Sequence, residues 1–287
     1  MIERVDQDKR GVTEDALRAQ LEWHGHDPER DRWVIEHPTT PREFVAHAWV
    51  FQQTSERCNL HVSVHPDWRR QGLGTQLLAE AIIRAEAYKA GHVLAYICGK
   101  DDSRQAFPHH HGFRRMGDSW TLRFNQETIP EPVLPDGYVI RTHAQFNHLP
   151  SLSTLMHRCY HDRFGHAENT RGVVTPEYIR NLMEKYPDHF PADSMFLVIH
   201  PFGKAIGFVK AVHGNVIDSP GVVPEERGGG WYRTLALIAM RQLRERGADQ
   251  IELLSYGDSL ETIREYQELG FKVSDHYLAY QKDLPKN

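Results

Sequence analysis

The chain has 287 residues, 40 % hydrophobic and 25 % charged, with a formal net charge of −5 at pH 7, a composition typical of a globular protein with room for two domains. No apolar run approaches the roughly 18 residues of a membrane-spanning helix, and the acidic balance predicts neither a nucleic-acid partner nor a membrane. The 3 cysteines form no Cys-x-x-Cys pair, which excludes a disulfide framework or a cysteine-bound zinc and indicates a cytoplasmic protein.

The first half of the chain predicts one α/β unit. A helix over 13–22 precedes three strand candidates, RWVIE at 32–36, EFVAHAWVF at 43–51 and NLHVSV at 59–64. The glycine-rich turn RRQGLG then opens a long helix, because apolar residues recur on one face: Leu77, Leu78, Ala81, Ile82 and Ala85. The apolar run HVLAYIC predicts a buried strand, and a short helix, the pair Gly112-Phe113 and two strands end the unit.

The second half repeats this order of elements. The segment QETIPEPVLPDG, residues 126–137, predicts a linker, because its prolines favour extended chain. A helix over 175–185 and the strand candidates MFLVIH, KAIGFVKAV and GNVIDSPGVV precede the turn RGGG, a long helix and the strand QIELLSY. The second half also begins with a strand and a helix, GYVIRTH and LPSLSTLMHRCYHDRFG, for which the first half has no room before Val12.

A repeat at an offset of 158 residues relates the two halves. The recurring residues are Val64, Pro66, Arg69, Gly72, Gly112 and Phe113, matched by Val222, Pro224, Arg227, Gly230, Gly270 and Phe271. Further segments recur in the same order, which chance does not explain. The sequence therefore predicts a first unit over 1–125, a linker over 126–137 and a second unit over 138–287.

The loop of the first half suits a diphosphate. A strand ending in Val-x-Pro is followed by Arg-x-x-Gly-x-Gly and an amphipathic helix. The N–H groups of such a turn and the positive end of the helix dipole hold phosphates, and glycines let them approach the backbone. The spacing is neither the dinucleotide fingerprint nor a P-loop.

These motifs carry a resemblance to a family. VSVHPDWRRQGLGTQLL, residues 62–78, resembles the acetyl-CoA loop of the GNAT superfamily of N-acyltransferases, and DSLETIREYQELGF, residues 258–271, resembles its last helix. The resemblance covers nearly the whole chain as a tandem, an organisation similar to that of the mycothiol synthases. It implies an α/β (α+β) fold with two GNAT-like units. Each would have a mixed, mostly antiparallel sheet flanked by helices, with splayed central parallel strands, 59–65 and 93–98 in the first unit.

The resemblance also implies acetyl-CoA, or another acyl-CoA, as co-substrate, and no metal. Its pantetheine arm would pair with the backbone near Val62 and Val64. The loop residues would hold the pyrophosphate, with two arginines adding charge; they are Arg69, Arg70, Gln71, Gly72, Leu73, Gly74 and Thr75. An acceptor amine would attack the thioester directly, and a nearby tyrosine would protonate the departing thiolate.

Each half departs from the family pattern at a different place. In the first half, the tyrosine position is Pro108, which has no proton to give and interrupts the helix. In the second half that position is Tyr266, but Tyr232 replaces the second loop glycine and Pro220 stands inside the strand expected to hold pantetheine. Glycines 228–230 still leave phosphate binding there open.

A general base is less clearly marked. In the second half, Asp218 is a candidate to pair with Tyr266 as base and acid. The alternatives are a turn-forming aspartate and a tyrosine packed on the sheet. In the first half, the base-bearing face holds Cys58 and Leu60, and Glu56 if the strand extends that far. The segment PHHHG at 108–112 does not predict a metal site, because its adjacent histidines point in different directions. A further segment, CYHDRFGH at 159–166, lies in the opening helices of the second half. It fits acceptor contacts or a surface helix.

The leading hypothesis is an acyl-CoA-dependent N-acyltransferase whose first unit holds the CoA and whose acceptor is a small-molecule or peptide amine. One alternative places catalysis in the second unit, with Tyr266 as acid. The other is a non-catalytic CoA-binding scaffold. The missing first strand leaves a sheet edge that favours a homodimer.

Overall fold

The computed structural model describes residues 18, 21, 26–99, 104–166, 174–185, 193–212 and 214–285. They form two compact groups, unit 1 (Met1–Met116 with Leu278–Asn287) and unit 2 (Gly117–Tyr277). This division differs from the predicted boundaries, because residues 117–125 belong to unit 2 and the C-terminal segment belongs to unit 1. The predicted helix over 13–22 lies almost wholly outside the described residues.

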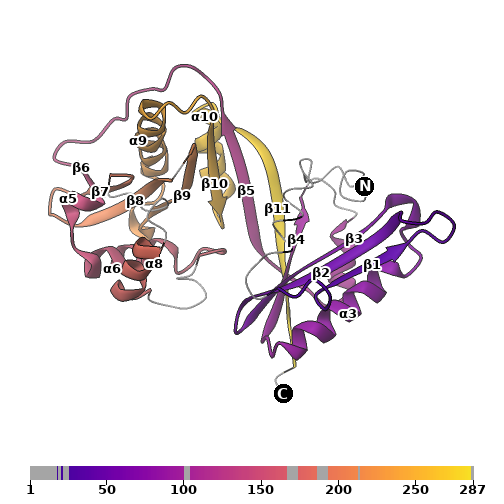
Figure 1. The fold of residues 1–287 in the computed structure, drawn as a ribbon. Coiled ribbons are helices and arrows are strands. Elements are labelled where there is room, and N and C mark those ends of the chain that lie inside the picture. Colours follow the sequence, from indigo (N-terminus) through magenta and orange to yellow (C-terminus); the bar gives the residue numbers. More distant parts are fainter. Residues whose placement is uncertain are drawn as a thin grey trace. The chain divides into compact units, whose positions relative to one another are not determined.

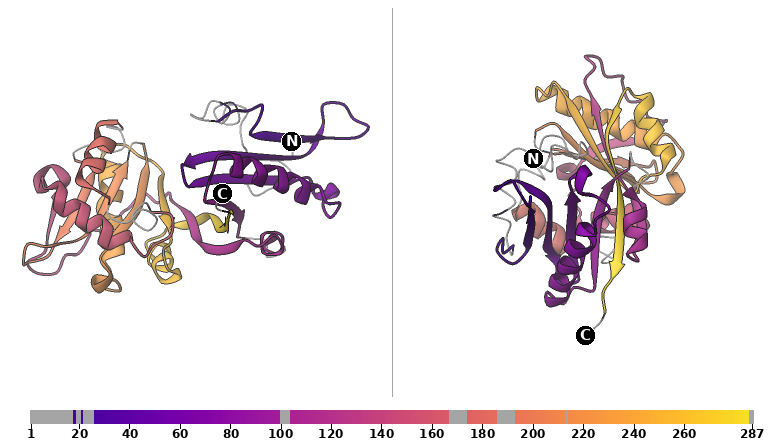
Figure 2. Two further views of the ribbon diagram at one scale, coloured as in Figure 1. Left: turned by 90° about the horizontal axis from the view of Figure 1, so that it is seen from below. Right: turned by 90° about the vertical axis from the view of Figure 1, so that its right-hand side faces the viewer.

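Unit 1 contains the first glycine loop. Its elements are β1 (Arg32–Glu36), β2 (Phe44–Thr54), β3 (Arg57–Val64), the 3₁₀ turn η1 (Pro66–Trp68), α3 (Leu73–Ala87), β4 (His92–Cys98), α4 (Ala106–His110), the start of β5 (Arg114–Phe124) and the end of β11 (Lys272–Asp283). The strands follow the order β1-β2-β3-β4-β11. Period-2 alternation buries Ala46, Ala48 and Val50 of β2, and helix α3 covers that face of the sheet (Figures 1 and 2).

Unit 2 contains the second loop. Its elements are β6 (Val139–Thr142), α5 (His143–Phe146), α6 (Leu149–Tyr160), α8 (Pro176–Lys185), β7 (Met195–Ile199), β8 (Ala205–Val212), β9 (Val216–Val222), η4 (Pro224–Glu226), α9 (Trp231–Glu245), β10 (Ile251–Tyr256) and α10 (Leu260–Glu268). The strand order is β11-β5-β10-β9-β8-β7-β6. Helices α9 and α10 cover one face of the sheet and α6 and α8 the other (Figure 1). The apolar face of α9 is buried at Leu235, Ala239 and Leu243 and partly buried at Ile238.

In each unit the two parallel central strands pair over only three residues. Strand β3 pairs with β4 from Arg57↔His92 to Asn59↔Leu94, and β9 pairs with β10 from Val216↔Glu252 to Asp218↔Leu254. We call the residues beyond these pairs the ladder end: 60–64 with 95–98 in unit 1, and 219–222 with 255–256 in unit 2. All other strand pairs with a determined register are antiparallel. The predicted mixed sheet with central parallel strands is therefore confirmed.

The end of β11 supplies part of the core of unit 1. Leu278, Tyr280 and Leu284 are buried in one apolar cluster with residues of β2, β3 and β4. The sequence did not indicate this placement, because an alternating strand has the same pattern whichever sheet accepts it. Unit 1 is consequently built from two segments that are far apart in the chain.

Candidate functional site

The first loop ends in a helix start with available backbone donors. Gly72 is the N-cap of α3, with φ +83°, and the N–H of Gln76 makes the first helical bond, 3.0 Å to the Gly72 carbonyl. The N–H groups of Leu73, Gly74 and Thr75 therefore have no partner inside the helix. Together with the helix dipole they favour an anion at this point.

The two glycines of this loop have different surroundings. Among the described residues, no heavy atom lies within 4 Å of a Cβ built on Gly72. A Cβ on Gly74 would lie 3.4 Å from the Phe107 ring and 3.6 Å from the Val64 side chain. A side chain at position 74 would therefore enter the space between the end of β3 and helix α4. The loop fits a diphosphate, because its glycines keep the donors accessible.

The predicted strand residues lie at the ladder end of unit 1. Val62 and Val64 pair with Ala48 and Ala46 of β2 on one side, and their strand has no register pair with β4 beyond Asn59. Among the predicted loop arginines, Arg69 donates from Nε to the Val64 carbonyl at 3.1 Å, and Arg70 is exposed with φ +64°. The structure thus brings the predicted strand, loop and helix start together.

The second loop has the same backbone but a different charge. Arg227 repeats the bond of Arg69, to the Val222 carbonyl at 3.2 Å. Its guanidinium is held by both carboxylate oxygens of Asp162, at 2.6 and 2.8 Å. Residues 224–230 carry two acids and one arginine, whereas residues 66–72 carry one acid and two arginines. The first loop is therefore the better anion site.

Tyr232 stands in unit 2 at the position that Gly74 has in unit 1. Its side chain is buried, and its ring packs edge-on against that of Tyr266 at 6.5 Å between centroids. The guanidinium carbon of Arg163 lies 5.8 Å from the same ring. Burial raises the pKa of Tyr232 to about 12, so its hydroxyl stays neutral.

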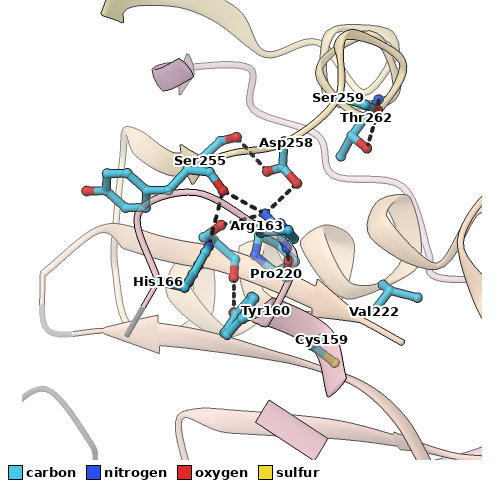
Figure 3. A network of polar contacts seen from close by, with 12 residues as sticks. Cys159, Tyr160, Arg163, His166, Pro220, Val222, Ser255, Asp258, Ser259 and Thr262 are labelled. Carbon is cyan, nitrogen blue, oxygen red and sulfur yellow. Dashed lines mark hydrogen bonds and ion pairs between the residues drawn. The ribbon is translucent and has the colours of Figure 1, made fainter. Parts of the chain in front are cut away.

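Arg163 bridges the two strands at the ladder end of unit 2 (Figure 3). One guanidinium nitrogen donates to the Pro220 carbonyl of β9 at 2.8 Å. The other donates to the Tyr256 carbonyl of β10 at 3.2 Å and to Asp258 at 2.5 Å, and also to Ser219 Oγ at 3.0 Å. Arg163 is 4 % exposed, so this ion pair is shielded from water. The side chain occupies the place where a substrate arm would enter between the strands.

Tyr160 and His166 make further contacts to β9 and β10 at the ladder end of unit 2. The Tyr160 hydroxyl donates to the Ser219 carbonyl, and His166 Nε2 lies 3.2 Å from the Tyr256 carbonyl. The two rings stack, with centroids 3.7 Å apart. Burial lowers the pKa of His166 to about 3, so the imidazole is neutral at neutral pH. The sequence analysis singled out 159–166 but interpreted it as acceptor contacts or a surface helix.

Tyr266 lies on α10, where the sequence placed it, but deep in the core. Its side chain is 0 % exposed, and its hydroxyl has no hydrogen-bond partner among the described residues. Burial, reinforced by the nearby Asp258 carboxylate, raises its pKa well above the ordinary value.

The two predicted bases lie in different surroundings. Asp218 forms an ion pair with Lys210 of the neighbouring strand β8. Burial would raise the pKa of Asp218, but the charge of Lys210 outweighs it and lowers the pKa. Glu56 is exposed in the turn between β2 and β3, at the other end of β3 from the loop, about 25 Å away along the strand. We therefore assign no catalytic role to Asp218 or Glu56.

Helix α4 of unit 1 is short and carries the predicted proline. It spans five residues with Pro108 buried at its centre. His111, which follows it, lies 3.2 Å from the Thr75 hydroxyl of α3. Within the described parts of the chain, no group of histidine, cysteine and carboxylate side chains is arranged to hold a metal ion.

Comparisons with known proteins agree with this architecture. The acetyltransferase (GNAT) domain pattern matches residues 28–115. A mycothiol acetyltransferase of Thermobispora bispora is 30 % identical over 234 residues, which are 78 % of this chain and 75 % of that protein. The chain belongs to the GNAT acetyltransferases. It is therefore an enzyme of a family that uses acetyl-CoA, and none of its described helices is long and apolar enough to cross a membrane.

Two solved structures share this fold over nearly the whole chain. A GCN5-related N-acetyltransferase from Sphaerobacter thermophilus has a TM-score of 0.72 at 23 % identity, covering 98 % of this chain and 89 % of its own. A tandem GNAT protein from the clavulanic acid biosynthesis pathway has a TM-score of 0.59 at 17 % identity, covering 100 % of this chain and 94 % of its own. The predicted tandem GNAT organisation is confirmed.

Proposed function

We propose that unit 1 binds acetyl-CoA and that the protein transfers the acetyl group to an amine. The contrast between Gly74 and Tyr232 supports this assignment most directly. At position 74 the loop carries no side chain, and a Cβ built there would already touch Phe107 and Val64, whereas the equivalent residue of unit 2 is a tyrosine whose side chain is buried. Two further observations favour unit 1. Its loop has one more arginine and one fewer acid than the loop of unit 2, and Arg163 occupies the space between the strands in unit 2.

The acceptor is a small molecule or a peptide with a free amine. The relatives are named mycothiol acetyltransferases. The first acceptor to test is therefore the amine that remains when the acetyl group is removed from mycothiol. Unit 1 would hold the pyrophosphate on the N–H groups from Arg70 to Thr75 and the pantetheine arm along Val62 and Val64. The cytoplasmic location and the homodimer stay predictions.

Calorimetric titration with acetyl-CoA tests the assignment. The wild-type protein is expected to bind one acetyl-CoA per chain. Gly74→Tyr, which gives the first loop the residue of the second, is expected to abolish binding, because a side chain at this position crowds Phe107 and Val64 beside the proposed diphosphate loop. Arg233→Ala is the matched control, because Arg233 stands at the position of Thr75 in the second loop.

The two variants separate the two units. If Arg233→Ala loses binding and Gly74→Tyr retains it, the acetyl-CoA site lies in unit 2 and the proposal is wrong. A thermal unfolding curve of each variant checks that the loop substitution leaves the fold intact.

A further inference from the structure

Unit 1 has no tyrosine on α4 to protonate a departing thiolate. The helix reads AFPHH, with Pro108 buried at its centre. The equivalent position of unit 2 is Tyr266, 158 residues later. If unit 1 is the transferring unit, its proton donor has to come from another element.

The end of β11 brings a tyrosine to the corresponding region of unit 1. Tyr280 is 0 % exposed and packs in one cluster with Cys58 and Leu60 of β3 and with Val93 of β4. Cys58 and Val93 form one of the register pairs of β3 with β4, and Leu60 is the first residue of the ladder end. Strand β11 is the neighbour of β4 in the sheet. The Tyr280 ring therefore lies beside both strands, on the face covered by α3.

The hydroxyl of Tyr280 is directed at α4. It donates to Gln105 Oε1 at 3.3 Å and lies 3.5 Å from His109 Nε2, and the His109 ring packs edge-on against the tyrosine at 5.2 Å between centroids. His109 is itself exposed. A buried hydroxyl thus has a titratable neighbour that reaches solvent.

The repeat makes this arrangement specific to unit 1. At the offset of 158 residues, Tyr280 corresponds to Leu122 of β5, which is buried beside Leu253 of β10 in unit 2. Unit 2 therefore has its tyrosine on the helix and a leucine on the strand. Unit 1 has a proline on the helix and its tyrosine on the strand.

We propose that Tyr280 is the acid of unit 1, with His109 as its connection to solvent. This inference rests on the proposed acetyl transfer. The amine nitrogen bonds to the acetyl carbon, the carbon–sulfur bond breaks, and its electron pair stays on sulfur. Tyr280 gives its hydroxyl proton to the thiolate and regains one through His109, while the new amide nitrogen loses its extra proton to solvent.

Titration of the thiol of bound CoA tests this without an acceptor. The thiolate is followed by its ultraviolet absorbance in complexes of CoA with the wild-type protein and with Tyr280→Phe, which keeps the ring and removes the hydroxyl. A hydrogen bond from Tyr280 stabilises the thiolate, so Tyr280→Phe is expected to raise the pKa of the bound thiol by about one unit, a tenfold loss of thiolate at a given pH. The dissociation constant measured at low pH, where the thiol is protonated, is expected to change less than about threefold.

Tyr88→Phe is the matched control. Tyr88 also donates a hydrogen bond in unit 1, part-buried and 2.7 Å long to Asp31, but it caps the far end of α3. Removal of the Tyr88 hydroxyl is expected to leave the pKa of the bound thiol unchanged. An equal effect of both variants, or none from Tyr280→Phe, overturns the proposal while CoA binding to unit 1 stands. Absence of CoA binding to the wild-type protein overturns the proposed function as well.

Discussion

At the scale of single residues, His166 makes the folding stability of unit 2 depend on pH. It is stacked on Tyr160 and held neutral by burial, with a folded pKa of about 3 against an ordinary value of 6.5. Between these values the unfolded chain binds one proton more than the folded protein, so stability rises with pH across this window. The contribution of neutral His166 to the unfolding free energy is complete above pH 6.5 and is lost as the pH falls toward 3.

We therefore predict that His166→Phe flattens the acid side of the stability profile. The ring still stacks on Tyr160 but no longer titrates, so the loss of unfolding free energy below pH 6.5 falls by up to about 1.4 kcal/mol per pH unit. Urea unfolding at pH 7 and at pH 5 measures the difference. His110→Gln, at an exposed histidine of unit 1, is the control. An unchanged pH dependence in His166→Phe contradicts the assignment.

At the scale of elements, the segment from Tyr160 to His166 holds β9 and β10 together at their ladder end. The bridge depends on the ion pair of Arg163 with Asp258, which also accepts from Ser255 at 2.5 Å. Pro220 has no N–H to offer, and it lies at the irregularity in the pairing of β8 with β9. Side-chain donors therefore satisfy carbonyls that a regular ladder would pair with backbone.

Loss of this bridge has a large expected cost. Arg163→Met leaves the buried Asp258 carboxylate without its partner, and we predict a loss of about 3–5 kcal/mol in the unfolding free energy. The double variant Arg163→Met/Asp258→Asn removes the uncompensated charge and is expected to recover more than about 1 kcal/mol of it. Denaturant unfolding of the three proteins provides the comparison. A loss below about 1 kcal/mol in the single variant would mean that the bridge contributes little.

The sequence predicted the elements that local periodicity determines. The buried face of α3 at Leu77 and Ala81, the strand before each loop and the helix start at Gly72 all follow from spacing and glycine chemistry. It could not predict Arg163, because periodicity gives the face of a helix and not which side chain reaches across two strands. Nor could it predict the partner of Tyr280, because strand alternation is the same in either unit.

At the scale of the whole molecule, the chain order and the spatial division differ. Strands β5 and β11 each have residues in both units, and Leu278, Tyr280 and Leu284 belong to the core of the unit that contains β1 to β4. The unit proposed to hold acetyl-CoA is consequently incomplete without the C-terminal strand. Two separate cores predict two unfolding transitions, of which acetyl-CoA stabilises one.

Leu278→Ala identifies that transition. Leu278 is 2 % exposed in the core of unit 1, so the truncation is expected to cost about 2–5 kcal/mol in the transition of that unit. Acetyl-CoA at 100 times its dissociation constant is expected to stabilise the same transition by about 2.7 kcal/mol. Leu260→Ala, at a leucine of α10 that is 60 % exposed, is the matched control and is expected to change either transition by less than about 0.5 kcal/mol. Calorimetric melting of the wild type and both variants, with and without acetyl-CoA, measures these shifts. If Leu278→Ala lowers only the transition that acetyl-CoA leaves unchanged, the C-terminal strand does not support the cofactor-binding unit, and the role of Tyr280 fails with it.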